Sequence, residues 1–283
     1  MDRERISITV RKSLLRKLDG TVDGAKIRNR SHAIEYYLSQ ALSPRVSRAV
    51  ILAGGPGTKM RPLTYEVPKA LIPVHGKPLL TYTIELLKRY HIRNIVISIG
   101  HLGEKIREHF GNGEAYGVRI TYVNQEGVVG TGGALAAVDG LVGRETFLMI
   151  HGDLLVDIDL DDLISFHQES DFLASIALTS APDISAYGAV QVQRNRVVAF
   201  SEKPVQGKFD SQLINAGVYI MEPQIFDFIP ETRPCSLEKD VFAGLAKDKQ
   251  LGGYVFAGDW HDVSTPEAYE QALKRWQIDQ KAD

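Results

Sequence analysis

The sequence of 283 residues contains only one cysteine, Cys235, and this scarcity excludes several kinds of protein. A single thiol can form neither a disulfide within the chain nor a thiolate metal cluster. We therefore expect Cys235 to be a buried or partly buried free thiol. A chain without disulfides fits the reducing cytoplasm, and we expect a cytoplasmic protein.

Long apolar runs are also missing. No stretch approaches the roughly 20 apolar residues of a membrane span. The first five residues, Met-Asp-Arg-Glu-Arg, lack the apolar stretch of a signal peptide. Hydrophobic residues make up 44% and charged residues 24% of the chain, which is ordinary for a soluble globular protein. The composition thus predicts no membrane partner.

Charge is distributed unevenly along the chain, although the net charge is only −2. Residues 1–48 carry 11 Lys and Arg against 5 Asp and Glu, whereas the remainder carries 22 against 30. A basic head on an acidic body indicates two modules with different partners. We place one domain at residues 1–45 and a second at residues 48–283.

The first module is predicted to consist of one strand and two helices. Residues 5–10 alternate polar and apolar side chains, which is typical of a half-buried strand. Leu14, Leu15 and Leu18 recur at helical spacing, and a second helix is expected to begin with Ser31 as its N-cap and to end before Pro44. A lone strand needs a partner and about 40 residues is near the lower limit for independent folding, so we expect a dimer.

Residues 4–42 resemble the ribbon-helix-helix family of DNA-binding dimers. In that family two strands pair and their outward side chains enter the major groove. The resemblance implies Arg5, Ser7 and Thr9 as the residues that contact DNA, and the start of the second helix as a phosphate contact. The alternative is that this module only dimerises and that its basic charge is a solvated face.

The second module is predicted to be an α/β domain. Buried strands are expected at residues 49–53, 95–99, 120–123, 147–150 and 173–178, and helices at 79–90, 103–110, 132–138 and 160–168. This alternation predicts a doubly wound, mostly parallel (Rossmann-like) sheet. Residues 187–192 and 197–201, separated by a polar turn, predict a hairpin inserted into that sheet.

A glycine-rich loop directly after the first of these strands is the strongest functional signal. Residues 52–64 read Leu-Ala-Gly-Gly-Pro-Gly-Thr-Lys-Met-Arg-Pro-Leu-Thr. Glycines let main-chain N–H groups approach a polyphosphate, and Lys59, Arg61 and Lys69 would add cations. The spacing fits neither a Walker A loop nor a dinucleotide fingerprint, which would need glycine where Met60 stands.

The stretch from this loop through residues 67–78 resembles the signature of the sugar-1-phosphate nucleotidyltransferases, or nucleotide-sugar pyrophosphorylases. The family pattern is Gly-Gly-x-Gly-Thr-Arg, then Pro-Leu-Thr, Pro-Lys, Pro-Val and Lys-Pro. One departure is Lys59, where the family has arginine with its bidentate grip on phosphate. The resemblance covers roughly residues 48–275.

The resemblance implies roles for residues in four groups. The loop residues Lys59, Arg61 and Lys69 would face the phosphates as catalytic cations. The nucleotide would be bound by Leu52, Ala53, Gly54, Gly55, Gly57, Thr58, Gln125, Gly130 and Thr131. The sugar phosphate would be bound by Gly152, Glu202, Lys203 and Asn215. Asp153 and Asp262 would bind Mg²⁺, the implied cofactor, which prefers oxygen ligands.

The implied reaction joins an NTP and a sugar 1-phosphate to give an NDP-sugar and pyrophosphate, an activity of EC 2.7.7 type. The motifs most resemble the mannose-1-phosphate and heptose-1-phosphate guanylyltransferase branch, followed by enzymes that use UTP or dTTP with glucose 1-phosphate. A rival interpretation is a DNA-binding regulator whose large domain senses nucleotide sugars. The replacement by Lys59 favours it slightly, and the pair of metal aspartates argues against it.

Overall fold

The structure is a computed structural model, and it describes residues 7–24, 27–42, 46–205 and 209–276. The chain divides into two compact units, residues 1–45 and residues 46–283. Among the described residues, no helix is both long enough and apolar enough to cross a membrane.

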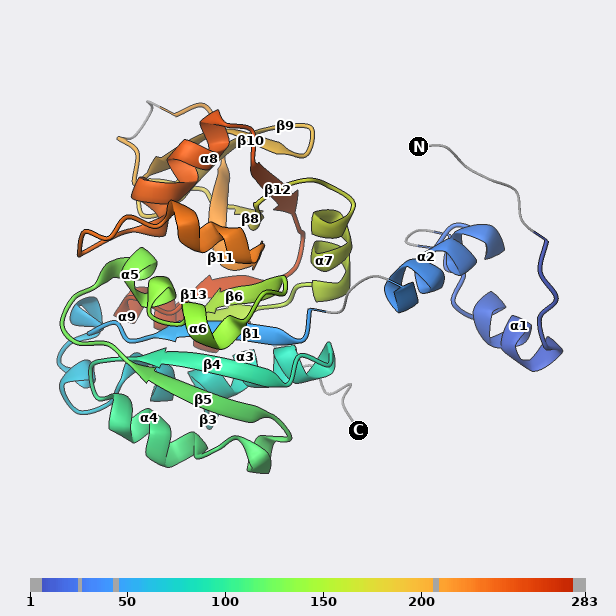
Figure 1. Cartoon of the computed structure of the whole chain (residues 1–283). Helices are drawn as coiled ribbons and strands as arrows, with labels where there is room; N and C mark the ends of the chain where they lie inside the picture. Colours follow the sequence, from blue (N-terminus) through green and yellow to red (C-terminus); the bar gives the residue numbers. More distant parts are fainter. Residues whose placement is uncertain (1–6, 25–26, 43–45, 206–208, 277–283) are drawn as a thin grey trace. The chain divides into compact units, whose positions relative to one another are not determined.

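The first unit contains two helices, α1 (Lys12–Asp19) and α2 (Arg30–Leu42) (Figure 1). The two helices are linked by a bidentate ion pair, in which the Arg30 guanidinium donates to both carboxylate oxygens of Asp19 at 2.7 and 2.8 Å. The expected N-cap at Ser31 is wrong, because Asn29 Oδ1 accepts from the backbone N–H of His32 at the start of α2.

The predicted strand of this unit lies only partly within the described residues. Residues 7–10 have no regular secondary structure in the single chain, and Arg5 lies outside the described part. Ser7 and Thr9 are exposed. A strand of this kind pairs only with a second chain, so the ribbon remains a prediction.

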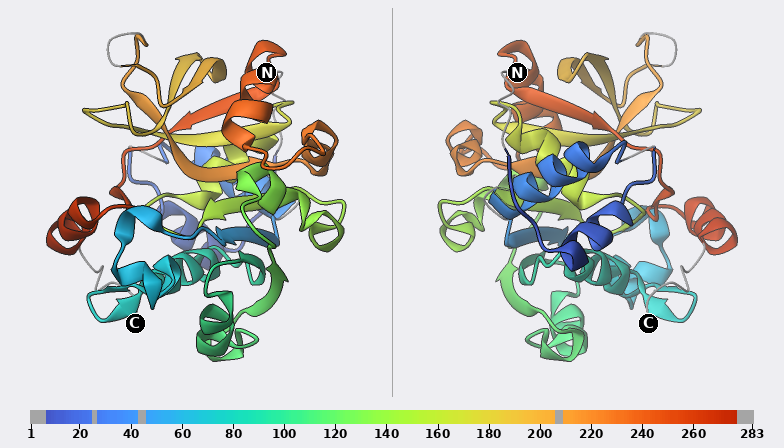
Figure 2. Two further views of the ribbon diagram at one scale, coloured as in Figure 1. Left: turned by 90° about the vertical axis from the view of Figure 1, so that its left-hand side faces the viewer. Right: turned by 90° about the vertical axis from the view of Figure 1, so that its right-hand side faces the viewer.

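The second unit is built around one sheet of nine strands in the order β5-β4-β1-β6-β11-β8-β12-β10-β9 (Figure 1). In chain order these strands are β1 (Arg48–Ala53), β4 (Asn94–Ile99), β5 (Arg119–Asn124), β6 (Phe147–His151), β8 (Ala174–Ser180), β9 (Gly188–Gln193), β10 (Arg196–Glu202), β11 (Leu213–Met221) and β12 (Leu251–Val255). Figure 2 shows the hairpin of β9 and β10 at the opposite end of the sheet from β5. The five strands and the hairpin predicted from the sequence are therefore confirmed, but β5 is an edge strand and is only partly buried, contrary to the prediction of a buried strand.

The sheet is mixed, and the prediction of a mostly parallel sheet is wrong. Strands β4, β5, β1 and β6 pair in parallel, as do β8 and β12. Strand β11, however, runs antiparallel to both of its neighbours, β6 and β8, and β10 runs antiparallel to β12 and β9. β11 contains Asn215 and Gly217, which are rare in strands, and this composition concealed a central strand in the sequence.

Helices cover both faces of the sheet because side chains alternate between its faces along each strand. Ile51 of β1 belongs to a core that includes residues of α3, α4 and α7, whereas the adjacent Val50 belongs to a core that includes residues of α5, α6 and α8. The helices of this unit are α3 (Leu79–Arg89), α4 (Gly103–Phe110), α5 (Gly130–Ala136), α6 (Asp139–Val142), α7 (Leu160–Gln168), α8 (Ala243–Lys247) and α9 (Pro266–Arg275).

The second unit also contains two short β-ribbons and a π-helix outside the main sheet. Two small ribbons pair β2 (Pro73–Val74) with β3 (Lys77–Pro78), and β7 (Leu154–Val156) with β13 (Trp260–Asp262). A π-helix, Leu237–Phe242, leads directly into α8. The β7–β13 ribbon brings the segment around Asp262 beside the residues that directly follow β6.

Candidate active site

The glycine-rich loop follows β1 at the carboxyl end of the strand, where open α/β sheets bind ligands. Gly57 has φ = 60°, and a Cβ there would lie 2.8 Å from the Thr64 side chain, so only glycine fits. Thr64 Oγ1 donates to the Gly57 carbonyl at 2.7 Å and fixes the turn. The conformation of the loop at Gly57 is thus fixed by its own sequence.

A first cavity, the glycine-loop cavity, has a volume of about 270 Å³. Its lining includes ten of the predicted residues: Leu52, Ala53, Gly54, Gly55, Lys69, Gln125, Gly130, Thr131, Gly152 and Asp153. The Gln125 side chain packs directly over Gly54, where a Cβ would lie 2.5 Å from Gln125 Oε1, and its amide donates to the buried Ser98 hydroxyl. The amide therefore has a defined orientation in the wall of the cavity.

A second cavity, the Lys59 cavity, has a volume of about 470 Å³ and lies along the other side of the glycine loop. Its lining brings Gly57, Thr58 and Lys59 together with Lys69 and Asp262. Arg61 does not line either cavity, because its guanidinium stacks over the Tyr65 ring at 5.0 Å. The structure thus places Lys59 among the other predicted residues and Arg61 apart from them.

Asp153 and Asp262 meet where the β7–β13 ribbon begins. Asp153 directly follows Gly152 after β6, Asp262 pairs with Leu154, and the Val263 amide donates to the Asp153 carbonyl at 2.9 Å. The Lys69 ammonium forms an ion pair with Asp153. Backbone pairing between segments distant in sequence therefore holds the two carboxylates together, and the Lys69 ammonium joins them through its ion pair with Asp153.

The electrostatics of this group are strongly coupled. Burial disfavours ionisation of Asp153, but the contacts with Lys69 and the nearby His151 together outweigh it and hold the pKa of Asp153 below its ordinary value. Burial and the nearby charge of Asp153 raise the pKa of Asp262 to about 6. Burial alone would lower the pKa of Lys69, but Asp153 and Asp262 raise it. One cation thus only partly balances two carboxylates.

The donor set at this point suits a hard cation. Asp262 Oδ1 is buried and has no hydrogen-bond partner among the described residues. Two aspartates match the one or two carboxylates with which proteins usually bind Mg²⁺ alongside phosphate oxygens. Within the described part of the chain, no group of three or more His, Cys, Asp or Glu forms a metal site, so substrate oxygens would have to complete the coordination shell.

A third cavity, the Glu202 cavity, has a volume of about 240 Å³ and contains the other predicted polar residues. Glu202, Lys203 and Asn215 line it together with Asp153 and Asp262. Burial and the charge of Glu238 raise the pKa of Glu202. Asn215 is displayed by a bulge in β11, where its Oδ1 accepts from the Gly217 amide and its Nδ2 donates to Tyr219 at 2.8 Å.

The three cavities adjoin one another. Thr131 and Asp153 line both the glycine-loop and the Glu202 cavities, Lys69 lines both the glycine-loop and the Lys59 cavities, and Asp262 lines both the Lys59 and the Glu202 cavities. Asp153, Lys69 and Asp262 therefore stand at the junction of all three. Such an arrangement can hold two polar ligands with their anionic parts together.

Several residues that were not among the predicted site residues also line the Glu202 cavity, and four of them carry polar or aromatic side chains: His151, Tyr187, Glu238 and Trp260. Trp260 donates to the Ala216 carbonyl at 2.9 Å and meets the Tyr187 ring edge-on at 5.4 Å. Trp260 lies two residues before Asp262, one of the two predicted metal ligands. Tyr187 had no signal of its own.

Comparison with known proteins assigns a family to this arrangement. A model of the nucleotidyl transferase family matches residues 48–277, which include all three cavities. The chain belongs to this family. The family resemblance predicted for the large domain is thereby confirmed, whereas the ribbon-helix-helix resemblance of residues 4–42 remains a prediction.

Individual members of the nucleotidyl transferase family share about a third of their residues with this chain. A mannose-1-phosphate guanylyltransferase of Mycobacterium tuberculosis is 37% identical over 224 residues, covering 78% of this chain and 62% of that protein. A UTP–glucose-1-phosphate uridylyltransferase of Synechocystis is 34% identical over 243 residues, covering 80% and 62%. The chain thus spans about 62% of the length of these curated relatives.

Solved structures share the fold of the large unit. A UDP-glucose pyrophosphorylase, solved in complex with UDP-glucose, superimposes with a TM-score of 0.73. It covers 82% of this chain and 98% of the other, at 24% sequence identity. The α/β nucleotidyltransferase architecture is therefore shared, although most side chains differ.

Proposed function

We propose that this protein transfers a nucleotidyl group from an NTP to a sugar 1-phosphate, giving an NDP-sugar and pyrophosphate. The observation that supports this proposal is the position of Asp153, Lys69 and Asp262 at the junction of three polar cavities. Two phosphorylated substrates bound on either side of this junction would meet there through their phosphates. Family membership of residues 48–277 supports the same conclusion.

In the proposed reaction an oxygen of the sugar phosphate attacks the α-phosphorus of the NTP, a new P–O bond forms, and the bond to pyrophosphate breaks. The sugar phosphate is already anionic, so no general base is required. Lys69 would neutralise charge at the reacting phosphates, and Lys203 would hold the sugar phosphate. Lys59 would face the β- and γ-phosphates from its own cavity.

Asp153 and Asp262 are the residues that would hold Mg²⁺ in this site. Bound there, the ion supplies charge neutralisation on phosphate oxygens. The two carboxylates would keep their charges beside the reacting phosphates, and Lys69 would balance part of that charge. Backbone pairing of β7 with β13 fixes the aspartates before any substrate arrives, so positioning contributes to the rate.

The glycine-loop cavity would receive the nucleotide. Gln125 packs over Gly54 in its wall, and an amide can both donate to and accept from a base edge. We favour GTP with mannose 1-phosphate or heptose 1-phosphate as substrates, and UTP or dTTP with glucose 1-phosphate as the next pair. A mannose-1-phosphate guanylyltransferase and a UTP–glucose-1-phosphate uridylyltransferase among the relatives support these two choices.

Release of pyrophosphate tests the proposal. The full chain is incubated with Mg²⁺ and each of four NTPs against mannose, heptose and glucose 1-phosphates. We expect one pair to give pyrophosphate and the matching NDP-sugar, identified by mass spectrometry. Absence of pyrophosphate with every pair would contradict the proposal and favour the rival function, a regulator that senses nucleotide sugars without catalysis.

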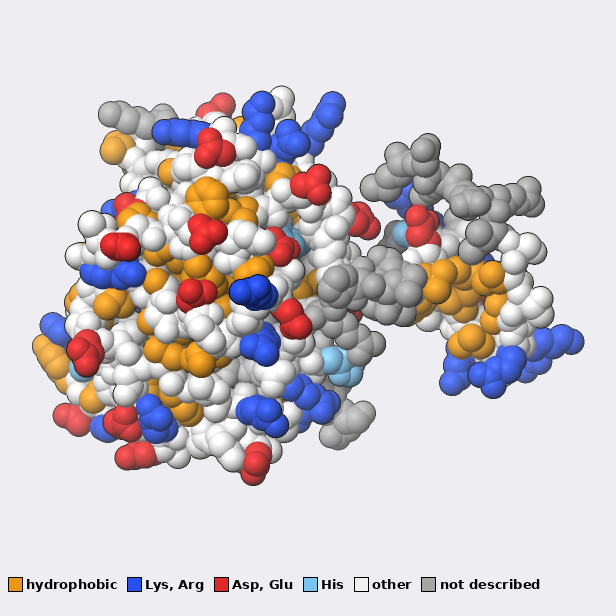
Figure 3. Space-filling model, viewed as in Figure 1, with side chains coloured by type: hydrophobic (Ala, Val, Ile, Leu, Met, Phe, Trp, Pro, Cys, Tyr) orange, Lys and Arg blue, Asp and Glu red, His pale blue; other side chains and the backbone are white. Residues whose placement is uncertain are grey.

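The first unit, we propose, makes the protein a homodimer. Ile8, Leu14, Tyr37 and Leu38 are exposed in the single chain, between 40% and 53% of each residue, and Figure 3 shows apolar side chains gathered on the visible face of this unit. A helix pair of this size buries too little apolar surface to be stable alone. Pairing with a second copy would cover these side chains.

DNA is the proposed further partner of this unit. Lys and Arg side chains lie over α1 in Figure 3, and Ser7 and Thr9 are exposed beside it in the sequence. A gel-shift titration with genomic fragments tests this binding at rising salt, because phosphate contacts make affinity fall steeply with ionic strength. No shift at low salt would leave dimerisation as the function of the unit.

A further inference from the structure

Glu238 is a buried carboxylate in the wall of the Glu202 cavity, with only 8% of the residue exposed. It lies near the start of the π-helix Leu237–Phe242, a rare form that is frequent at functional sites. Burying a charge is costly unless hydrogen bonds compensate for the lost water. The partners of Glu238 therefore indicate what the carboxylate is for.

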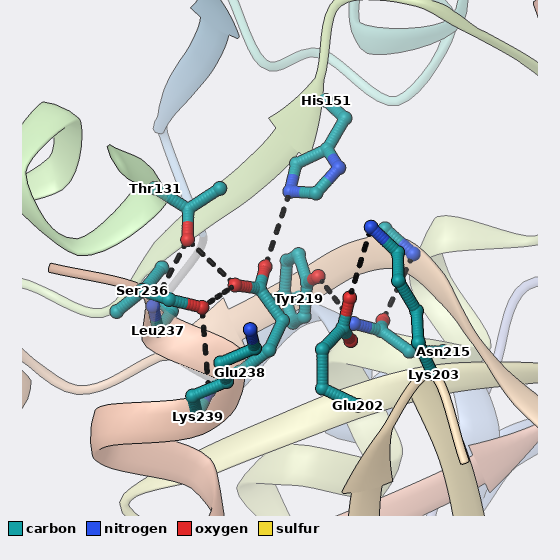
Figure 4. A network of polar contacts seen from close by, with 11 residues as sticks. Thr131, His151, Glu202, Lys203, Asn215, Tyr219, Ser236, Leu237, Glu238 and Lys239 are labelled. Carbon is teal, nitrogen blue, oxygen red and sulfur yellow. Dashed lines mark hydrogen bonds and ion pairs between the residues drawn. The ribbon is translucent and has the colours of Figure 1, made fainter. Parts of the chain in front are cut away.

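One oxygen of this carboxylate is fully engaged within the protein. Glu238 Oε2 accepts from the hydroxyls of Thr131 and Ser236, each at 2.6 Å. The Thr131 oxygen in turn accepts from the Leu237 amide at 2.9 Å. Figure 4 shows these hydroxyls on one side of the carboxylate, so its orientation is fixed.

The other carboxylate oxygen, Oε1, faces the His151 ring without forming a hydrogen bond to it. Glu238 Oε1 lies 3.9 Å from His151 Nε2, which is too long for a hydrogen bond. That ring nitrogen is buried and has no hydrogen-bond partner among the described residues. Both side chains line the Glu202 cavity and point toward each other in Figure 4. A ligand atom placed between Glu238 Oε1 and His151 Nε2, at the wall of the cavity, could therefore contact both.

A hydroxyl group satisfies both of these atoms. A hydroxyl oxygen can lie about 2.8 Å from both Glu238 Oε1 and His151 Nε2. It would donate its proton to the carboxylate and accept a hydrogen bond from the ring N–H. A phosphate fits this position less well, because no described Lys or Arg pairs with Glu238 as Lys69 pairs with Asp153. The position therefore belongs to the sugar ring, and the phosphate belongs beside Lys203 and Lys69.

We infer that Glu238 and His151 together bind one hydroxyl of the sugar 1-phosphate and so contribute to sugar specificity, while Thr131 and Ser236 act as positioning residues. This inference rests on the proposed function. Thr131 also lines the glycine-loop cavity, so the same hydroxyl that orients Glu238 connects the walls of the two substrate cavities.

Steady-state kinetics of Glu238→Gln tests the inference, with the sugar 1-phosphate and the NTP varied separately. We expect the KM for the sugar 1-phosphate to rise about tenfold, which corresponds to about 1.4 kcal/mol, because a neutral amide oxygen accepts a weaker hydrogen bond than a carboxylate does. The KM for the NTP should stay within twofold. Thr131→Val should shift the sugar KM in the same direction by less, and Thr131→Ser should restore it.

Glu222→Gln is the matched control. Glu222 also accepts from a threonine, Thr146 at 2.8 Å, and contacts a histidine, His167 at 3.1 Å, but it lines none of the three cavities. Its kinetic constants should therefore equal those of the wild type. A change in the sugar KM of this control as large as that of Glu238→Gln would show a merely structural effect and overturn the inference.

Deoxy sugar 1-phosphates identify the hydroxyl. Wild-type protein should lose about tenfold in kcat/KM with the one analogue that lacks the hydroxyl bound by Glu238, and Glu238→Gln should no longer distinguish that analogue from the parent sugar. Normal turnover with equal losses in both proteins would overturn the assignment of Glu238 and leave the proposed function intact. A wild type without turnover would overturn both.

Discussion

Lys69 shows how single residues in this site depend on one another. Its ammonium pairs with Asp153 and also feels the charge of Asp262, and both carboxylates raise its pKa. Removing one charge from this group leaves the others unbalanced in partly buried surroundings, which is costly. Substitutions here are therefore best made with isosteric neutral residues, which keep the packing.

Asp153→Asn is predicted to lower kcat by about 100-fold or more, because loss of one preorganised charged group at reacting phosphates typically costs that factor. The fold should persist, since the Asp153 carbonyl still accepts from the Val263 amide. Pyrophosphate release measures the rate, and far-UV circular dichroism checks the fold. An asparagine variant with wild-type kcat would remove the magnesium assignment.

Lys59→Arg restores the arginine that the family pattern has at this position. Arginine grips phosphate through two parallel hydrogen bonds where lysine offers a point charge. We expect kcat/KM for the NTP to rise about threefold to tenfold, an energy of roughly 1 kcal/mol. Arg61→Lys is the control, because Arg61 stacks on Tyr65 and lines neither the glycine-loop cavity nor the Lys59 cavity. A marked loss of kcat/KM for the NTP in Arg61→Lys would show that Arg61 does take part in nucleotide binding.

The buried side chain of His167 should make the stability of the protein depend on pH. It is buried, its ring nitrogens contact Ser175 at 2.8 Å and Glu222 at 3.1 Å, and burial lowers its pKa below 6.5. The unfolded chain then binds a proton at a higher pH than the folded chain. This residue therefore makes the free energy of unfolding fall as the pH drops from 6.5 toward the folded pKa.

Urea unfolding at pH 7.5, 6.5 and 5.5 measures this effect. The wild type should lose stability over that range more steeply than His167→Gln, whose side chain does not titrate. The substitution itself costs about 1–3 kcal/mol at pH 7.5 through lost hydrogen bonds. Parallel pH profiles of the two proteins would contradict the assignment to His167.

At the scale of elements, the sequence predicts β1, β4 and β6 of the parallel half of the sheet because most of their side chains are apolar on both faces. Residues 147–150, for example, are fully buried in β6. β11 is different, since the irregularity between Asn215 and Tyr219 lies at the Glu202 cavity and breaks the apolar pattern. Its antiparallel direction depends on long-range pairing, which no local pattern records.

The same distinction between local and long-range signals applies to the residues of the candidate site. Residues in continuous motifs, such as the glycine loop and Asp153, could be predicted because their spacing is local. Tyr187 could not, since it reaches the Glu202 cavity only through the folding of the β9–β10 hairpin. Local spacing does not reveal Glu238 either, because its orientation depends on Thr131, a residue in another element.

Helix α5 is clamped to the segment before the π-helix, and Gly130 is the point of closest approach. Gly130 has φ = 75°, and a Cβ there would lie 2.2 Å from the Cys235 carbonyl oxygen. Gly130→Ala should therefore destabilise the protein by about 2–3 kcal/mol and raise the KM for the NTP. Thermal unfolding and kinetics measure the two effects.

Gly127→Ala is the matched control for this change. Gly127 has φ = 73°, but a Cβ there would meet nothing within 4 Å. The control should cost only about 1 kcal/mol through backbone strain. Equal destabilisation by the two substitutions would show that the contact with Cys235 is unimportant.

At the scale of the whole molecule, Leu14→Asp is predicted to abolish dimerisation while transferase activity persists. Leu14 is 52% exposed on α1, and a charge in a dimer interface would be buried without a partner. Analytical ultracentrifugation should show dimers for the wild type and monomers for the variant. Val255→Asp, at a 54% exposed residue of the large unit, should remain dimeric. Monomeric wild-type protein would contradict the proposal.

The β7–β13 ribbon has a consequence for the order in which the protein matures during synthesis. The ribbon joins Asp262 to a segment that leaves the ribosome much earlier, beside Asp153. A nascent chain that already displays the glycine loop, Lys69 and Asp153 still lacks its second carboxylate. Competence to bind the two proposed substrates should therefore arise abruptly, late in translation, when β13 emerges from the exit tunnel and pairs with β7.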